Sequence, residues 1–119
     1  MTPTIILFGA DPMTAAMARS TLTRNGILTI IPDRKEYLRP LESFLPPFGA
    51  AKAPVFQGKL EEPLVVLCGF GSLDEVLPLL ASVRLGRGTL KAVLTPHNRR
   101  WNAVMLLREL QKERRSMGG

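Results

Sequence analysis

Few side chains in this sequence are suited to nucleophilic or acid–base chemistry. There is one cysteine, Cys68, and one histidine, His97, and each is expected at the end of a buried strand, where a thiol and an imidazole could form a nucleophile–base pair. A cysteine in an apolar strand normally behaves as a small hydrophobic residue, and only Asp11 is available to orient the imidazole. Because a catalytic site usually gathers several titratable groups, we predict no catalytic residues and lean against an enzyme.

Motifs for metals and cofactors are missing as well. One cysteine and one histidine cannot complete a four-ligand zinc site, and a single cysteine cannot form an internal disulfide. The Gly69–Ser72 turn (GFGS) lacks the third glycine of a dinucleotide fingerprint, and the Gly9–Asp11 stretch is not a phosphate-binding P-loop. We therefore expect no metal and no cofactor. The unpaired cysteine, with no signal peptide and no apolar run of membrane length, favours the cytoplasm.

Four short apolar runs define the elements that would position these residues. The runs alternate with helical segments, a pattern typical of α/β proteins. With 119 residues, the chain is expected to form one domain, residues 1–119, at roughly 100–150 residues per domain. Nearly continuous apolar strands favour burial on both faces, so we predict an open, mainly parallel four-stranded sheet in the order 2-1-3-4 with helices on both faces. The predicted strands are residues 4–10, 27–31, 64–68 and 90–95, and the predicted helices are residues 12–24, 72–85 and 102–114.

Capping residues mark the expected helix boundaries. Asp11 is the expected N-cap of the first helix, and Asn25–Gly26 is its expected end. Ser72 and Glu75 have the spacing of a capping box, which places the start of the second helix at Ser72. Pro78 lies too far inside that helix to be tolerated, so we also expect a kink or a delayed start.

The stretch between the second and third strands contains no long regular element. Residues 33–45 are expected to form two short helical turns, because Pro40 interrupts their apolar face. A Pro/Gly-rich connection follows at about 46–63. It is long for a compact domain, and Val55–Phe56 is its expected anchor.

In a parallel sheet, ligands bind at the edge formed by the carboxyl ends of the strands. The turns after the first, third and fourth strands are expected to meet at that edge. Plain structural roles compete with binding there: Asp11 as a cap, Asn98 bonded to the backbone of its loop, and Trp101 packed over the core. The candidate ligand- or partner-binding residues are Asp11, Gly69, Gly71, Ser72, His97, Asn98, Arg99, Arg100 and Trp101.

The net charge of +6 is concentrated near the C-terminus. Residues 84–119 hold nine Lys and Arg against two Glu, a net of +7, whereas residues 1–83 carry −1. Such a segment favours an anionic partner such as nucleic acid, although charges on a terminal helix often only face solvent. Trp101 is the only aromatic residue after Phe70, which argues against a stacking platform for single strands.

One C-terminal pattern is more specific. Residues 94–101 read Leu-Thr-Pro-x-Asn-Arg-x-Trp, and a Leu-x-x-Glu-Leu tail follows at 106–110. Because of this pattern, the chain resembles a family of small bacterial proteins classed as a domain of unknown function, and the resemblance covers about residues 64–112. The family pattern has Thr after the Trp and Glu three residues later. Because Asn102 and Met105 stand there in this chain, one cap interaction is expected to be absent. The resemblance implies a small cytoplasmic bacterial protein and no established reaction.

These observations lead to two hypotheses about function. The first is a non-enzymatic protein-binding or self-associating module, favoured by the apolar circumference of the second helix and by the Pro-rich connection. The second is an anion-binding domain, for nucleic acid or a phosphorylated small molecule, that uses the basic C-terminal third. The expected partner is accordingly a protein or a second copy, with nucleic acid as the alternative and no membrane.

Overall fold

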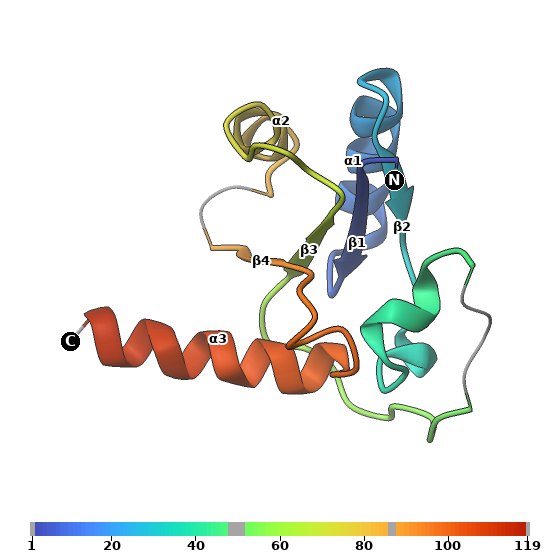
Figure 1. Ribbon diagram of the computed structural model, residues 1–119, viewed down its shortest axis with the longest axis vertical. Helices are drawn as coiled ribbons and strands as arrows, with labels where there is room; N and C mark the ends of the chain where they lie inside the picture. The colour runs from blue at the N-terminus through green and yellow to red at the C-terminus, as the bar shows by residue number, and fades with distance from the viewer. Residues whose placement is uncertain (1, 48–51, 86–87, 119) are drawn as a thin grey trace.

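The computed structural model describes residues 2–47, 52–85 and 88–118, and it is built around a four-stranded sheet (Figure 1). The strands are β1 (Thr4–Phe8), β2 (Leu28–Ile30), β3 (Leu64–Cys68) and β4 (Leu90–Val93). Their order across the sheet is β2-β1-β3-β4, which confirms the predicted order. β1 and β3 are central and fully buried, whereas β2 and β4 are edge strands with exposed side chains at Leu28 and Val93.

The predicted direction of the strands is wrong at the centre of the sheet. β2 runs parallel to β1 and β4 runs parallel to β3, but β1 and β3 are antiparallel, with Thr4 opposite Cys68 and Phe8 opposite Leu64. The sheet is therefore mixed rather than mainly parallel. After β2 the chain stays at the edge where β1 ends, and Leu60 lies against Gly9 there. β3 therefore starts beside the end of β1 and runs back.

Helices cover both faces of the sheet, as predicted. The helices are α1 (Pro12–Arg24), α2 (Val76–Ser82) and α3 (Ala103–Gly118), and two 3₁₀ turns, η1 (Arg34–Glu36) and η2 (Leu41–Phe44), confirm the expected pair of short turns. Side chains alternate along each strand. Ile5 and Leu7 pack with residues of α1 and α2, whereas Ile6 and Phe8 pack with residues of η2 and α3. No helix in the described part of the chain has both the length and the apolar character that a membrane span requires.

The boundaries of α1 are those that its capping residues predict. The Thr14 backbone N–H donates to the Asp11 carboxylate (2.9 Å), and Pro12 occupies the first helical position. The Thr14 hydroxyl donates to the other Asp11 oxygen (2.8 Å), and these bonds lower the pKa of Asp11. Gly26 follows the helix with φ of +76°, the left-handed conformation that glycine adopts without a steric penalty.

The start of the second helix differs from the capping-box prediction. α2 begins at Val76, and the Ser72 hydroxyl accepts a hydrogen bond from the Asp74 N–H (3.2 Å) within a turn. Glu75 makes no capping hydrogen bond. The delayed start places Pro78 in the first turn, where its missing N–H breaks no helical bond. The helix ends at Ser82 rather than at residue 85.

The connection before β3 is anchored by one aromatic residue, as expected. The Phe56 N–H donates to the Lys35 carbonyl (3.1 Å), and the Phe56 ring stacks on Tyr37 with centroids 5.9 Å apart. Residues 52–63 contain neither helix nor strand, and residues 48–51 of the predicted connection lie outside the described residues.

Candidate functional site

The antiparallel pairing of β1 and β3 separates the turns that were expected to share one edge. Gly9 follows β1 at one edge, whereas Gly69 follows β3 at the opposite edge. The loop after β4 starts at the Gly69 edge and then turns onto the α3 face, where the Leu41 N–H donates to the Trp101 carbonyl (2.8 Å). The structure therefore does not bring Asp11 and Gly69 together at a common rim.

Within the loop after β4, Asn98 has a structural role. Its side chain is buried, with the residue 8% exposed. The side-chain oxygen accepts a hydrogen bond from the Thr95 N–H (2.9 Å), and the side-chain amide donates to the Val93 carbonyl (3.1 Å). Asn98 thereby fixes the turn that leads from β4 to α3, which is the plain structural role considered from the sequence.

The other candidate residues of that loop have different environments. Arg99 forms an ion pair with Glu42 on η2 (3.5 Å), and Arg100 is exposed. The His97 and Trp101 rings meet edge to face with centroids 5.2 Å apart, and Trp101 packs against the core on the α3 face. These contacts attach the loop to the rest of the molecule.

Cys68 has the environment of a core residue. It is 2% exposed, and burial raises the pKa of its thiol to about 12, so the thiol remains protonated at neutral pH. Its sulfur lies 3.9 Å from the Val66 carbonyl oxygen, whereas His97 is exposed and meets Trp101 edge to face. Across the described ranges, no group of three or more His, Cys, Asp or Glu side chains could hold a metal ion.

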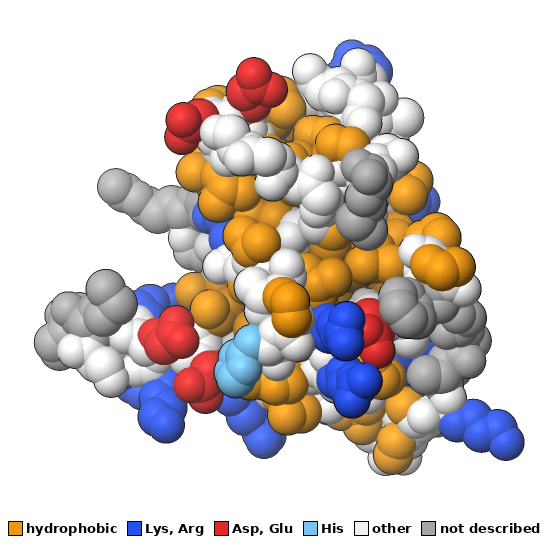
Figure 2. All heavy atoms as spheres, viewed as in Figure 1, with side chains coloured by type: hydrophobic (Ala, Val, Ile, Leu, Met, Phe, Trp, Pro, Cys, Tyr) orange, Lys and Arg blue, Asp and Glu red, His pale blue; other side chains and the backbone are white. Residues whose placement is uncertain are grey.

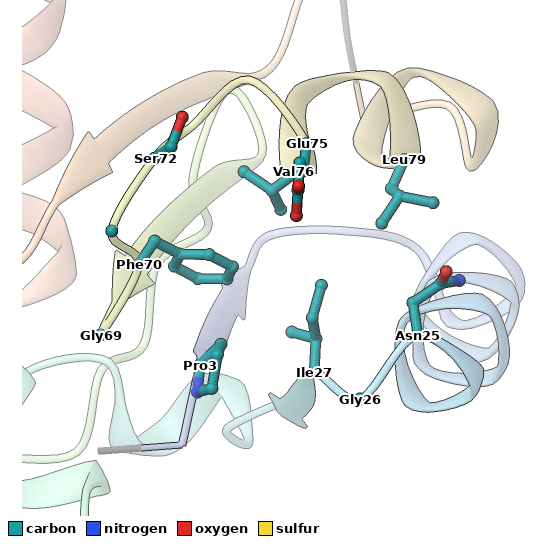
Figure 3. A pocket seen from close by; sticks show the side chains of 11 residues that line it. Pro3, Asn25, Gly26, Ile27, Gly69, Phe70, Ser72, Glu75, Val76 and Leu79 are labelled. Carbon is teal, nitrogen blue, oxygen red and sulfur yellow. The ribbon is translucent and has the colours of Figure 1, made fainter.

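A pocket of about 600 Å³ lies at the Gly69 edge of the sheet, beneath α2 (Figure 3). Two segments distant in the sequence form its walls. One is the turn between α1 and β2, and the other is the turn that joins β3 to α2. The lining residues are Pro3, Asn25, Gly26, Ile27, Gly69, Phe70, Gly71, Ser72, Glu75, Val76 and Leu79.

The pocket combines an apolar floor with one carboxylate. The Phe70 ring, Ile27 and Leu79 point into it, and the Glu75 side chain hangs from the start of α2 toward the same space (Figure 3). Among the described residues Glu75 forms no ion pair, so its charge is available to a ligand. Asn25 donates from its amide to the Thr21 carbonyl (2.8 Å), and this bond holds the opposite wall.

Local sequence explains how the walls meet. Gly69 has φ of +76°, which lets the chain leave β3 abruptly, and the late start of α2 leaves residues 70–75 free to arch over the sheet edge. The sequence identified Gly69, Gly71 and Ser72. It missed Glu75 as a lining residue because the sequence assigns Glu75 to a capping box. It missed the opposite wall from Asn25 to Ile27 because that wall meets the end of β3 only when β1 and β3 are antiparallel.

A second pocket, of about 440 Å³, lies at the opposite edge, near the start of α1. Gly9 and Tyr37 line it, and the Gly9 N–H donates to the Tyr37 hydroxyl (2.8 Å). Arg34 and Lys59 are the cationic side chains of its wall. Both side chains are exposed to solvent.

Comparison with known families confirms the resemblance at the C-terminal end of the chain. Residues 63–117 match the family model of a domain of unknown function, DUF3783. The match runs from β3 to α3, so it contains one wall of the larger pocket, Gly69 to Leu79, whereas the wall from Asn25 to Ile27 lies outside it. No curated protein and no solved structure matches this chain.

Proposed function

We propose that this chain, which carries the DUF3783 segment on a mixed α/β sheet, is a non-enzymatic protein-binding module. Its pocket between the α1–β2 turn and the β3–α2 turn receives an apolar side chain of a partner protein, and Glu75 pairs with a lysine or arginine next to that side chain. The observation that carries the proposal is the apolar floor of Phe70, Ile27 and Leu79 beneath a single unpaired carboxylate.

The size of the pocket supports this function. A volume of about 600 Å³ lies within the range of sites that enclose a small ligand or a few side chains. Apolar surface continues outside the pocket at Leu28, which is 46% exposed and whose N–H donates to the Pro3 carbonyl of the pocket wall (2.9 Å). Leu77 on α2 is 39% exposed. Exposed apolar surface around a pocket is typical of protein contact sites.

The charge of the pocket decides which ligands it favours. Glu75 lines the pocket at the start of α2, and none of the described residues that line it is Lys, Arg or His. The exposed Glu75 carboxylate attracts a cation and repels a phosphate through their charges. This pocket therefore favours a basic and apolar partner segment over a phosphorylated small molecule.

The chemistry of the pocket also favours binding over catalysis. Glu75 is the one acidic or basic side chain among the described residues that line it. General acid–base or nucleophilic mechanisms normally need a second group within hydrogen-bond reach. Cys68 and His97 do not line it.

An amide NMR titration with two peptides tests the proposal. An acetylated and amidated peptide with Leu-Lys-Leu at its centre is the probe, and the same peptide with Leu-Glu-Leu is the control. We expect the first to shift the amide signals of Gly26, Gly69 and Gly71 and to bind about tenfold more tightly than the second, which corresponds to about 1.4 kcal/mol. Equal affinity of the two peptides, or shifts elsewhere in the chain, would contradict it.

Variants then assign the effect to the pocket. Glu75→Lys should abolish the preference for lysine, whereas Asp74→Lys, which makes the same charge change at the adjacent exposed residue outside the pocket, should retain most of it. Gly71→Leu should block binding of both peptides without unfolding the chain, because a Cβ at Gly71 meets no atom within 4 Å. A Gly71→Leu variant that binds normally would exclude this pocket as the site.

A further inference from the structure

We propose that the solvent face of α3 binds the phosphate backbone of duplex DNA, independently of the pocket beneath α2. Three cations, Arg108, Lys112 and Arg115, are exposed on this helix. They are four and three residues apart, so they form one stripe along the helix. Lys and Arg side chains gather along the lower side of α3 in Figure 2.

The stripe lies opposite the buried face of the helix. Ala103, Leu106 and Leu107 are at most 4% exposed and attach α3 to the sheet. At 3.6 residues per turn, positions 108, 112 and 115 point away from these residues. The cations are therefore displayed to solvent by the packing of the helix itself.

The stripe differs from the other basic residue of the same helix. Arg114 donates to both carboxylate oxygens of Glu62, at 2.8 and 2.6 Å, and is already neutralised. Within the described part of the chain, Arg108, Lys112 and Arg115 form no ion pair. Like charges three or four residues apart repel, at a cost of about 0.2–0.5 kcal/mol per pair, and a bound polyanion relieves that repulsion.

The shape of the molecule favours a duplex. The C-terminal end of α3 projects beyond the strands of the sheet (Figure 1), so the helix is accessible from several sides there. From Arg108 to Arg115 the helix advances by seven residues, or about 10 Å, which is the length of the stripe. A helix about 10–12 Å across fits the major groove of B-form DNA. The major groove of A-form RNA is too narrow and deep for side chains to enter, which favours DNA.

Other anionic partners fit the surface less well. A platform for single strands needs exposed aromatic rings, but Trp101 packs against the core and meets His97 edge to face. An amphipathic helix that lies in a membrane surface presents large apolar side chains beside its cations. Among the described side chains of α3, which exclude that of residue 117, Met105 is the large apolar one that is exposed, at 48%.

The test is a binding isotherm with a fluorescein-labelled DNA duplex of about 20 base pairs, measured by anisotropy at several salt concentrations. With three phosphate contacts, affinity should fall roughly 30- to 50-fold between about 50 and about 200 mM salt. The triple variant Arg108→Gln, Lys112→Gln, Arg115→Gln should reduce the slope of log affinity against log salt by about 3.

A matched triple variant controls for net charge. Arg19→Gln, Arg24→Gln, Lys52→Gln removes the same charge from exposed positions away from α3 and should leave the slope unchanged. Equal losses in the two variants, or no binding by the unmodified chain, would overturn the proposal. So would tighter binding to an RNA duplex of the same length, or to vesicles of anionic phospholipid, than to DNA.

Discussion

Arg114 on α3 and Glu62, 52 positions earlier in the chain, meet through two parallel hydrogen bonds of 2.8 and 2.6 Å. The Gln111 side-chain amide donates to the same carboxylate (3.1 Å). Glu62 immediately precedes the residues that lead into β3, so this contact ties the end of the connection to the terminal helix. The paired guanidinium lowers the pKa of Glu62 to about 2.

Removing this pair should destabilise the chain in a pH-dependent manner. The ordinary pKa of Glu62 is 4.5 and its folded value is about 2, so the stabilisation is complete above pH 4.5 and is lost as the pH falls toward 2. We expect Glu62→Gln to lower the melting temperature by a few degrees at pH 7 and by almost nothing at pH 2. Thermal melts followed by circular dichroism measure this, and a difference that stays constant with pH would contradict it.

Two glycines with the same backbone conformation should respond differently to alanine. Gly9 and Gly26 both have φ of +76°, but a Cβ at Gly9 would lie 3.2 Å from the Glu62 carbonyl oxygen and 3.3 Å from the Leu60 Cβ, whereas a Cβ at Gly26 meets nothing within 4 Å. Gly26→Ala should cost about 1 kcal/mol of unfolding free energy through backbone strain alone. Gly9→Ala should cost about 2–3 kcal/mol, because crowding adds to the strain. Urea denaturation of both variants tests the difference, and equal losses would contradict it.

Asn98 should matter for stability rather than for binding. Asn98→Ala removes the bonds to the Thr95 N–H and the Val93 carbonyl and leaves both backbone groups partly buried, which should cost about 2–3 kcal/mol. The control is Arg100→Ala, at an exposed position of the same loop, which should change the unfolding free energy by about 0.5 kcal/mol or less. If the two substitutions prove equally mild in chemical denaturation, the turn does not depend on Asn98.

Cys68 should be unreactive in the folded chain and should make stability sensitive to alkaline pH. Its pKa rises from an ordinary 9.0 to about 12 on folding, so its contribution is complete below pH 9 and is lost as the pH rises toward 12. We expect iodoacetamide at pH 8 to modify the thiol only after denaturant is added. Cys68→Ala should lose less stability between pH 8 and pH 10 than the unmodified chain does. Rapid alkylation of the native protein would show that the thiol is accessible.

Local signals in the sequence predicted much of the fold because they depend only on neighbouring residues. Asp11 and Asn25–Gly26 define α1 through their own hydrogen-bonding and backbone preferences, and Leu64–Cys68 is a strand because every side chain is apolar. The start of α2 was missed because the Ser72 hydroxyl can cap a helix or close a turn. Pro78 favours the turn, because a helix that began at Ser72 would contain Pro78 in its interior.

The direction of β3 could not be read from the sequence, and the pocket depends on it. A run of five apolar residues predicts a buried strand but carries no signal for its direction relative to β1. The connection before β3 is long enough to allow either direction. The sequence therefore predicted the order of the strands but grouped Gly9 with Gly69. Pro3 and Asn25 carry no signal for a pocket by themselves, because they become its wall only through the antiparallel return.

The central position of β3 also constrains the segment that matches DUF3783. Within residues 63–117, β3 pairs with β4 on one side only, and its other hydrogen-bonding edge is covered by β1, which lies outside the match. Without β1, the backbone N–H and C=O groups along that edge of an entirely apolar strand would be unpaired. They would then be free to pair with a strand of another molecule. A chain built on this segment therefore needs a cover strand from elsewhere, and here β1, Thr4–Phe8, supplies it.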